Sequence, residues 1–163
     1  WWSPWPDDAK GASPMLIFND LANAGAAPVL EQVLRFAGAR QRLLAHNIAN
    51  IDTPDFRPVD VSPAAFREQL DRAVRKRREE RGGQSGELEF EDTEEVSFAR
   101  GASGSLTLKP ASPSRNVLYH DRNNRDLERL MQSVSENQLM YRTAADLLRR
   151  ENDLLRSAIS QRV

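Results

Sequence analysis

Residues 124–160 read NRDLERLMQSVSENQLMYRTAADLLRRENDLLRSAIS, and apolar side chains recur there every three or four positions. This spacing predicts one long amphipathic helix, because residues three and four apart share a helix face. The main row, which Glu151 interrupts, consists of Leu127, Leu130, Val134, Asn137, Tyr141, Ala144, Leu148 and Leu155. A second row beside it contains Met140, Leu147 and Leu154. The apolar stripe is therefore wide enough to contact more than one partner helix.

The segment at residues 28–50, PVLEQVLRFAGARQRLLAHNIAN, carries a matching pattern near the other end of the chain. Its apolar positions follow the 4-3-4-3-4 spacing of a coiled-coil helix and contain one polar member. They are Leu30, Leu34, Ala37, Gln41, Leu44 and Ile48. Pro28 suits the first turn of such a helix.

These two patterns predict the fold class. We expect a mainly α-helical protein in which the C-terminal helix, within residues 121–163, pairs with residues 28–51 as a coiled-coil-like hairpin. Two helices alone cannot cover the wide C-terminal stripe. The spare apolar surface predicts self-assembly or a partner.

The end of the first helix is marked by residues that stop helices. Thr53 precedes proline, which disfavours the helical conformation, and Asn50 suits a left-handed residue at the helix end. Three prolines follow within ten residues and predict an extended strip over residues 52–62. They are Pro54, Pro58 and Pro63.

The middle of the chain is predicted to be less regular. Ser62 and Pro63 read as the cap and first residue of a second helix that runs to about Arg78. Its apolar face would consist of Phe66, Leu70, Ala73 and Val74. Residues 79–115 read as a loop-rich insert with a small β-hairpin, whose candidate strands are residues 87–91, 96–98 and 106–108.

These elements divide the chain into four parts. Residues 1–14 are expected to be a disordered tail or a non-native start, since Met15 opens a sensible sequence. Residues 15–61 form the N-terminal helix and the extended strip, residues 62–120 the variable middle segment, and residues 121–163 the C-terminal helix.

Composition narrows the possible functions. The chain has 163 residues, of which 39% are hydrophobic and 29% charged, a net charge of -1 and no cysteine. It therefore has no disulfide scaffold and no thiolate metal site. The balanced charge disfavours nucleic acid as a partner, and no aromatic residue interleaves with the charged run at residues 72–81. No segment is apolar enough to insert into a membrane, and no cleavable signal peptide is visible.

Motifs for catalysis or cofactors are also missing from the sequence. The two histidines, His46 and His120, lack metal-ligand spacing, and neither glycine-rich run continues as a P-loop or a nucleophile elbow. Asp52, Asp55 and Asp60 read as capping or turn carboxylates. We predict no enzyme activity, no catalytic, cofactor-binding or metal-binding residue, and no cofactor.

Two motifs point to a family. Residues 44–56, LAHNIANIDTPDF, resemble the N-terminal signature NIANxxTPG[YF] of bacterial flagellar axial proteins. Residues 123–128, Met131 and residues 135–141, SENQLMY, resemble the C-terminal segment of the FlgB family of proximal rod proteins. The departures are His46 for a small residue, Asp55 for glycine and Arg125 for valine.

The resemblance implies a structural subunit of the proximal rod in the flagellar basal body, which assembles through its terminal helices and transmits torque from the MS ring. Its implied partners are FlgC-type rod subunits, a FliE-type adaptor at the MS ring, further copies of itself and the type III export apparatus. That apparatus would deliver it to the periplasmic rod without a cleavable signal. The implied assembly residues are Asn47, Ile48, Asn50, Asp52, Thr53, Pro54, Asn137, Leu139, Tyr141 and Leu148.

Two other interpretations stay open at this point. One is another rod or adaptor subunit of the same apparatus, and the other, from a different class, is a peptidoglycan-cleaving accessory protein of the rod.

Overall fold

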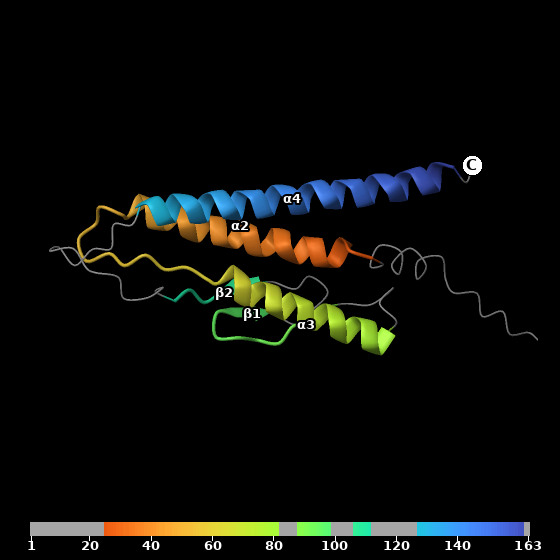
Figure 1. The fold of residues 1–163 in the computed structure, drawn as a ribbon, viewed down its shortest axis with the longest axis horizontal. Helices are drawn as coiled ribbons and strands as arrows, with labels where there is room; N and C mark the ends of the chain where they lie inside the picture. Colours follow the sequence, from red (N-terminus) through yellow and green to blue (C-terminus); the bar gives the residue numbers. More distant parts are fainter. Residues whose placement is uncertain (1–24, 82–87, 99–105, 112–126, 162–163) are drawn as a thin grey trace, which may run out of the picture.

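The computed structural model describes residues 25–81, 88–98, 106–111 and 127–161 of the chain. Its elements, in chain order, are α2 (Ala27–Ala49), α3 (Pro63–Arg81), β1 (Val96–Phe98), β2 (Leu106–Leu108) and α4 (Leu127–Ser160). Long N- and C-terminal helices lie side by side in opposite directions, and a small two-stranded antiparallel sheet lies in the middle of the chain (Figure 1). The predicted fold class is confirmed.

Helix α2 occupies the centre of the molecule. Helix α4 packs along one side of it, and α3 and the β-hairpin lie on the other side (Figure 1). Pro28 stands in the first turn of α2, as predicted. Because α2 is covered from two directions, it has to bury more than one row of side chains.

The interface between α2 and α4 combines alanine and leucine side chains. Ala37 and Leu44 of α2 are buried, as are Leu130 and Ala144 of α4. All four belong to the predicted rows. The rows are nevertheless covered unevenly, because a straight helix drifts out of step with a seven-residue repeat. The members left exposed are Leu127 and Tyr141 of α4 and Gln41 of α2.

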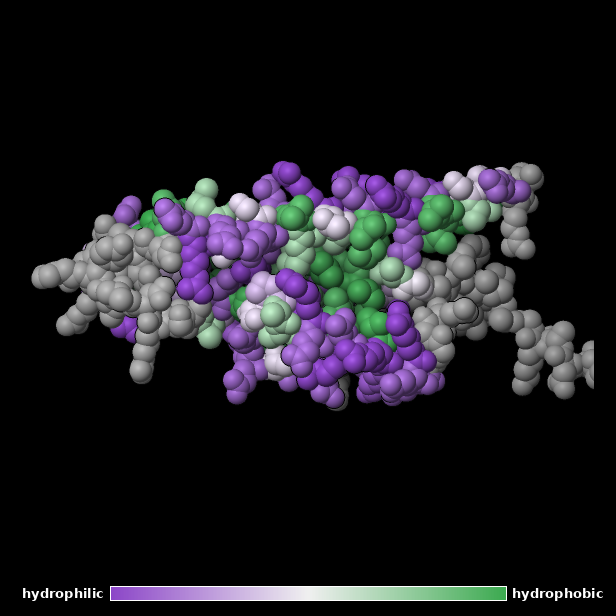
Figure 2. Space-filling model, viewed as in Figure 1, coloured by the Kyte–Doolittle hydropathy of each residue, from purple (hydrophilic) through white to green (hydrophobic). Residues whose placement is uncertain are grey.

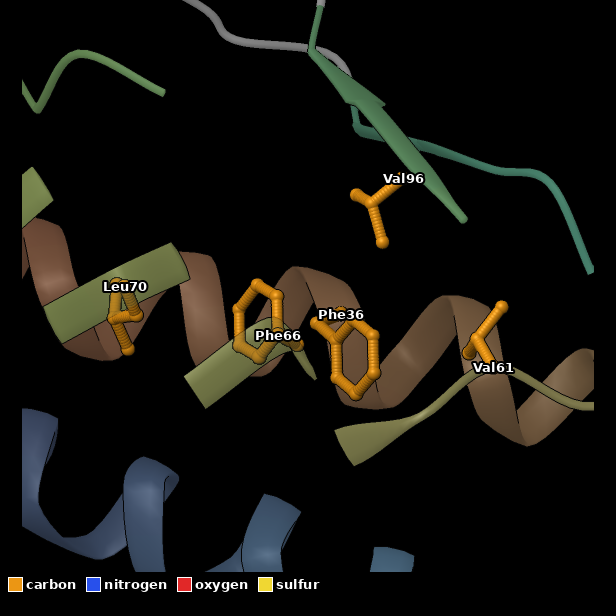
Figure 3. Close-up of a cluster of buried hydrophobic side chains, with 5 residues drawn as sticks. All are labelled: Phe36, Val61, Phe66, Leu70 and Val96. Carbon is orange, nitrogen blue, oxygen red and sulfur yellow. The ribbon is translucent and has the colours of Figure 1, made fainter. Parts of the chain in front are cut away.

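The main apolar core lies on the other side of α2 (Figure 3). The Phe36 and Phe66 rings stack with centroids 4.0 Å apart and an interplanar angle of 6°. The other buried members are Val61, Leu70 and Val96. The cluster therefore joins four parts of the chain, namely α2, the strip before α3, α3 itself and β1.

The chain leaves α2 through two successive turns. The Thr53 amide donates to the Asn50 carbonyl (3.0 Å), and the Phe56 amide donates to the Thr53 carbonyl (3.2 Å). The left-handed conformation predicted for Asn50 is wrong, because its φ is -108°; the residue with positive φ is Asp55, at 58°. The extended strip also begins later than predicted, since residues 52–55 belong to these turns and only the chain after them is extended.

Helix α3 begins as predicted and continues further. The Ser62 Oγ accepts a hydrogen bond from the Ala65 amide (3.2 Å), the contact of an N-cap. The helix reaches Arg81 rather than Arg78, and its charged end is not wholly exposed to solvent, because Arg77 is buried. The Arg77 Nη2 donates to the Gly25 carbonyl at 2.9 Å.

The hairpin pairs Val96 with Leu108 and Phe98 with Leu106, so two of the three predicted strands are confirmed. The prediction of a strand at residues 87–91 is wrong for its described residues, 88–91, which pair with no strand. The alternating pattern there still has a cause, because Leu88 and Phe90 pack on the core while Glu89 is exposed. Glu89 accepts from the Lys76 Nζ at 2.7 Å, and this contact raises the pKa of Lys76.

Several predictions concern segments outside the described residues. These are the tail at residues 1–14, the glycine-rich runs at 82–86 and 101–105, and the start of the last helix at Asn124. None of the described helices is long and apolar enough to cross a membrane.

Substitution of two glycines by alanine should change the stability of the protein in opposite directions. Gly25 has a φ of +82°, and an added Cβ would lie 2.8 Å from the Glu151 Oε1. Gly38 is helical, and no neighbouring side chain or other element lies within 4 Å of an added Cβ. We expect Gly25→Ala to lower the free energy of unfolding by about 1–2 kcal/mol, from left-handed strain. We expect Gly38→Ala to raise it by about 0.5–1 kcal/mol. Urea unfolding measures both, and shifts of the same sign would contradict the structure.

Candidate assembly site

Asn47, the first residue of the predicted assembly motif, is fully buried on α2. Its Nδ2 donates to the Val59 carbonyl (2.6 Å), and its Oδ1 accepts from the Val59 amide (3.2 Å). The side chain thus satisfies both backbone groups of one residue, much as a neighbouring strand would. It holds the returning strip against the helix.

Arg40 and Asp60 fix the same strip one step further along. The Arg40 Nε donates to one Asp60 carboxylate oxygen at 2.8 Å, and the Nη2 donates to the other at 2.5 Å. Asp60 also forms a β-bridge with Ala111, through backbone hydrogen bonds of 3.0 and 3.1 Å. This planar two-point pairing is the strongest geometry for a guanidinium and a carboxylate.

Sequence reasoning missed this pair. It treated Asp60 as a turn carboxylate, and it did not single out Arg40. A signal was present, because Arg40 lies four residues after Phe36 and four before Leu44, on the buried part of α2. A charge on an apolar face needs a buried partner.

The rest of the motif forms the turn itself. The Asn50 Nδ2 donates to the His46 carbonyl at 2.8 Å and lies 3.2 Å from the His46 Nδ1, so this side chain caps the C-terminus of α2. The His46 ring meets the edge of Phe56, with centroids 5.8 Å apart. Asp52, Thr53 and Pro54 are exposed at the tip.

Asn137 provides the polar contact between the two long helices. It is 1% exposed, and its Nδ2 donates to the Ala37 carbonyl and to the Gln41 Oε1, both at 2.9 Å. Its Oδ1 accepts no hydrogen bond from the described residues. A single polar residue in an apolar helix interface fixes the register of the pair, because any other register buries its amide without partners.

The remaining predicted residues differ in exposure. Ile48 and Leu148 are half-buried, Leu139 is 68% exposed and Tyr141 is 47% exposed. The predicted residues therefore do not converge on one site. Six of them, from Asn47 to Pro54, lie at the end of α2 and in its turn. The other four lie on α4, where Asn137 sets the helix pairing, Leu148 is half-buried, and Leu139 and Tyr141 are exposed.

The described residues contain no cluster of His, Asp or Glu that could hold a metal ion. The polar side chains named above instead satisfy backbone groups or one another. Through these hydrogen bonds, the arrangement joins segments that are far apart in the chain.

Comparison with known proteins adds a finding that the geometry alone does not give. The chain matches no family model. It is 32% identical over 104 residues to the flagellar basal body rod protein FlgB of Borrelia hermsii, and the match covers 63% of this chain and 71% of that protein. The chain belongs to the FlgB family. The name of this family describes a rod protein, which is a structural component. This agrees with the fold, in which the polar side chains described above cap helix ends and join packed segments.

In this FlgB-family fold, the Arg40–Asp60 pair should be essential for stability. Asp60→Ala leaves a guanidinium buried without its carboxylate, so we expect the free energy of unfolding to fall by about 3 kcal/mol. Asp71→Ala, at an exposed position of α3, is the matched control and should change it by less than about 0.5 kcal/mol. The double variant Arg40→Met/Asp60→Leu should recover most of the loss. Equal effects of the two aspartate variants in urea unfolding would contradict this role.

Asn137→Ala removes both hydrogen bonds between α4 and α2. We expect it to lower the free energy of unfolding by about 1–2 kcal/mol, the usual net worth of such bonds. Asn152→Ala, on an exposed position of the same helix, should change it by less than about 0.5 kcal/mol. Thermal unfolding followed by circular dichroism measures both variants, and matching shifts would exclude a special role for Asn137.

Proposed function

We propose that the chain is a structural subunit of the proximal flagellar rod, and that it assembles by packing α4 against helices of neighbouring rod subunits. The observation that carries this proposal is the set of large apolar side chains that α4 leaves exposed. They are Leu127, Met131, Leu139, Tyr141, Leu147, Leu154 and Ile159.

Part of this set follows a helix-pairing pattern of its own. An outer row with 4-3-4-3-4 spacing runs beside the positions that face α2. It consists of Leu127, Met131, Val134, Gln138, Tyr141 and Ala145. In the described structure, α2 covers the neighbouring row, which contains Leu130, Asn137 and Ala144. The outer row therefore has the spacing of a second coiled-coil face, on which a helix of a neighbouring subunit would pack.

Exposed apolar surface of this kind favours association. Single exposed apolar residues are ordinary, but a contiguous row along one helix is typical of a protein interface. In the space-filling view, apolar side chains gather between α4 and α3 and again near the C-terminal end of α4 (Figure 2). Burying them against neighbouring subunits would supply the free energy of assembly.

The predicted assembly residues then have two roles. Leu139, Tyr141 and the exposed tip at residues 52–54 would contact neighbours. The others position these surfaces from within the subunit, and they are Asn47, Ile48, Asn50, Asn137 and Leu148. Residues 15–61 and 121–163 would form the assembling layer, and residues 62–120 a variable part.

Membership of the FlgB family supports the placement of this subunit in the rod. We propose that its neighbours are FlgC-type rod subunits and a FliE-type adaptor at the MS ring. We also propose that the chain assembles in the periplasm after type III export. In the assembled rod, the packed helices would transmit torque. Site-specific cross-linking in isolated basal bodies, from Leu139, would identify these neighbours.

The outer row gives the decisive experiment. We expect Met131→Glu/Tyr141→Glu to leave the fold of the isolated protein intact, because both side chains are already exposed, but to abolish rod assembly. Ala64→Glu/Ala65→Glu, at exposed positions of α3 outside the proposed assembling layer, is the control and should support assembly. Both are tested in a deletion strain by counting flagella and measuring swarming. Normal flagella with the first variant would overturn the proposal.

A further inference from the structure

The outer row of α4 matches a second copy of itself. All of its members are exposed or half-buried. In an antiparallel pair centred on the middle of the row, Leu127 of each copy lies against Ala145 of the other, and Met131 lies against Tyr141. A large side chain thus meets a small one, and a thioether meets an aromatic ring. The row is therefore complementary to itself when one copy is reversed.

The charged residues beside the row have the same symmetry. On its flank away from α2, Glu128, Ser135 and Arg142 follow one another at intervals of seven residues, and all three are exposed. Neither Glu128 nor Arg142 forms an ion pair with another described residue. In the antiparallel pair, Ser135 lies at the midpoint, so Glu128 of each copy lies beside Arg142 of the other. A parallel pair would not join these charges, because each flank would then meet the opposite flank of the partner helix, which α2 covers.

The surroundings of the outer row leave space for a second copy. Met140 lies on the opposite side of α4 from Met131, at 100° per residue, and it packs against the core that α3 covers. Helix α3 is therefore turned away from the outer row. Helix α2 lies between these two sides of α4, so an antiparallel second copy brings its own α2 beside this one, as in a four-helix bundle.

The side of α2 that this arrangement brings together is open. Leu34, Gly38, Gln41 and Ala45 follow a 4-3-4 spacing there, and none of them is buried. An added Cβ at Gly38 would meet no neighbour within 4 Å. The Asn137 side chain donates to Gln41, so this part of α2 lies level with the centre of the outer row. Both helices of the hairpin therefore present a face to the second copy at the same level.

We propose that the free chain forms a symmetric dimer, in which α2 and α4 of two copies pack as an antiparallel four-helix bundle. A symmetric contact of this kind closes at two copies and cannot continue into a filament. The consequence for assembly rests on the proposed function: the dimer covers the outer row until the subunit joins the rod, where neighbouring helices replace the second copy.

Charge reversal tests the pairing in the full chain, with the dissociation constant of the dimer measured by sedimentation equilibrium. Glu128→Arg and Arg142→Glu each place like charges together at both ends of the interface, so each should weaken the dimer at least about tenfold. The double variant Glu128→Arg/Arg142→Glu restores both pairs and should return the constant to within about threefold of the original. Arg67→Glu, at an exposed position of α3, is the control and should leave it unchanged.

Introduced thiols report the direction of the pair, because the chain contains no cysteine. Met131→Cys chains mixed with Tyr141→Cys chains should form disulfide-linked heterodimers, since these positions face each other across the antiparallel interface. Each variant alone should cross-link poorly. Efficient cross-linking of Met131→Cys with itself would indicate a parallel contact and would overturn the proposal.

The dimer and the rod subunit fail in different experiments. A chain that stays monomeric up to about 0.1 mM, or that forms open-ended oligomers, would overturn the dimer and leave the proposed function standing. Normal flagella in a deletion strain that carries Met131→Glu/Tyr141→Glu would overturn the proposed function. In that case, rescue of the dimer by the double charge reversal would still establish the symmetric pair.

Discussion

The ion pair between Arg40 and Asp60 is the interaction on which the rest of this structure depends. It anchors the strip after α2 to the middle of that helix, with Asn47 holding the preceding residue. Only when the chain returns along α2 do Val61 and Phe66 reach Phe36, and only then can α3 and the hairpin pack. Asp60 also bridges to Ala111, so one carboxylate residue ties together α2, the strip and the segment after β2.

A central helix with two covered sides explains how a chain of modest apolar content folds. The apolar residues of α2 serve both the α4 interface and the core around Phe36, so few are needed elsewhere. As a result, α4 keeps part of its apolar stripe exposed. The stripe is wide enough for two partner helices, but within the described residues only α2 packs against it. The outer row is the surface that, in our proposal, helices of neighbouring rod subunits cover.

Local signals in the sequence predicted most of the elements. The two helix patterns, Pro28 in the first turn, the Ser62 cap and the strands at 96–98 and 106–108 all depend on neighbouring residues, so they could be read without the fold. The errors lie where distant contacts decide. Residues 88–91 alternate like a strand, yet Leu88 and Phe90 pack on the core, and the Gln69 side chain donates to the Glu91 carbonyl. Near the end of α3, the buried Arg77 likewise makes a distant contact, because it donates to the Gly25 carbonyl, which is far away in the sequence.

The sequence alone determined that this protein has two long amphipathic helices, a proline-marked turn between helices and no recognisable catalytic motif, because these features are written in spacing and residue type. It also carried the motifs that resemble the FlgB family. Only the tertiary structure decided what the motif residues do within the subunit. Asn47 binds a strip twelve residues away, Asn137 bonds to α2 a hundred residues away, and Arg40 finds its carboxylate in Asp60. Such pairings require the chain to fold back on itself, and no local pattern specifies which buried donor meets which acceptor.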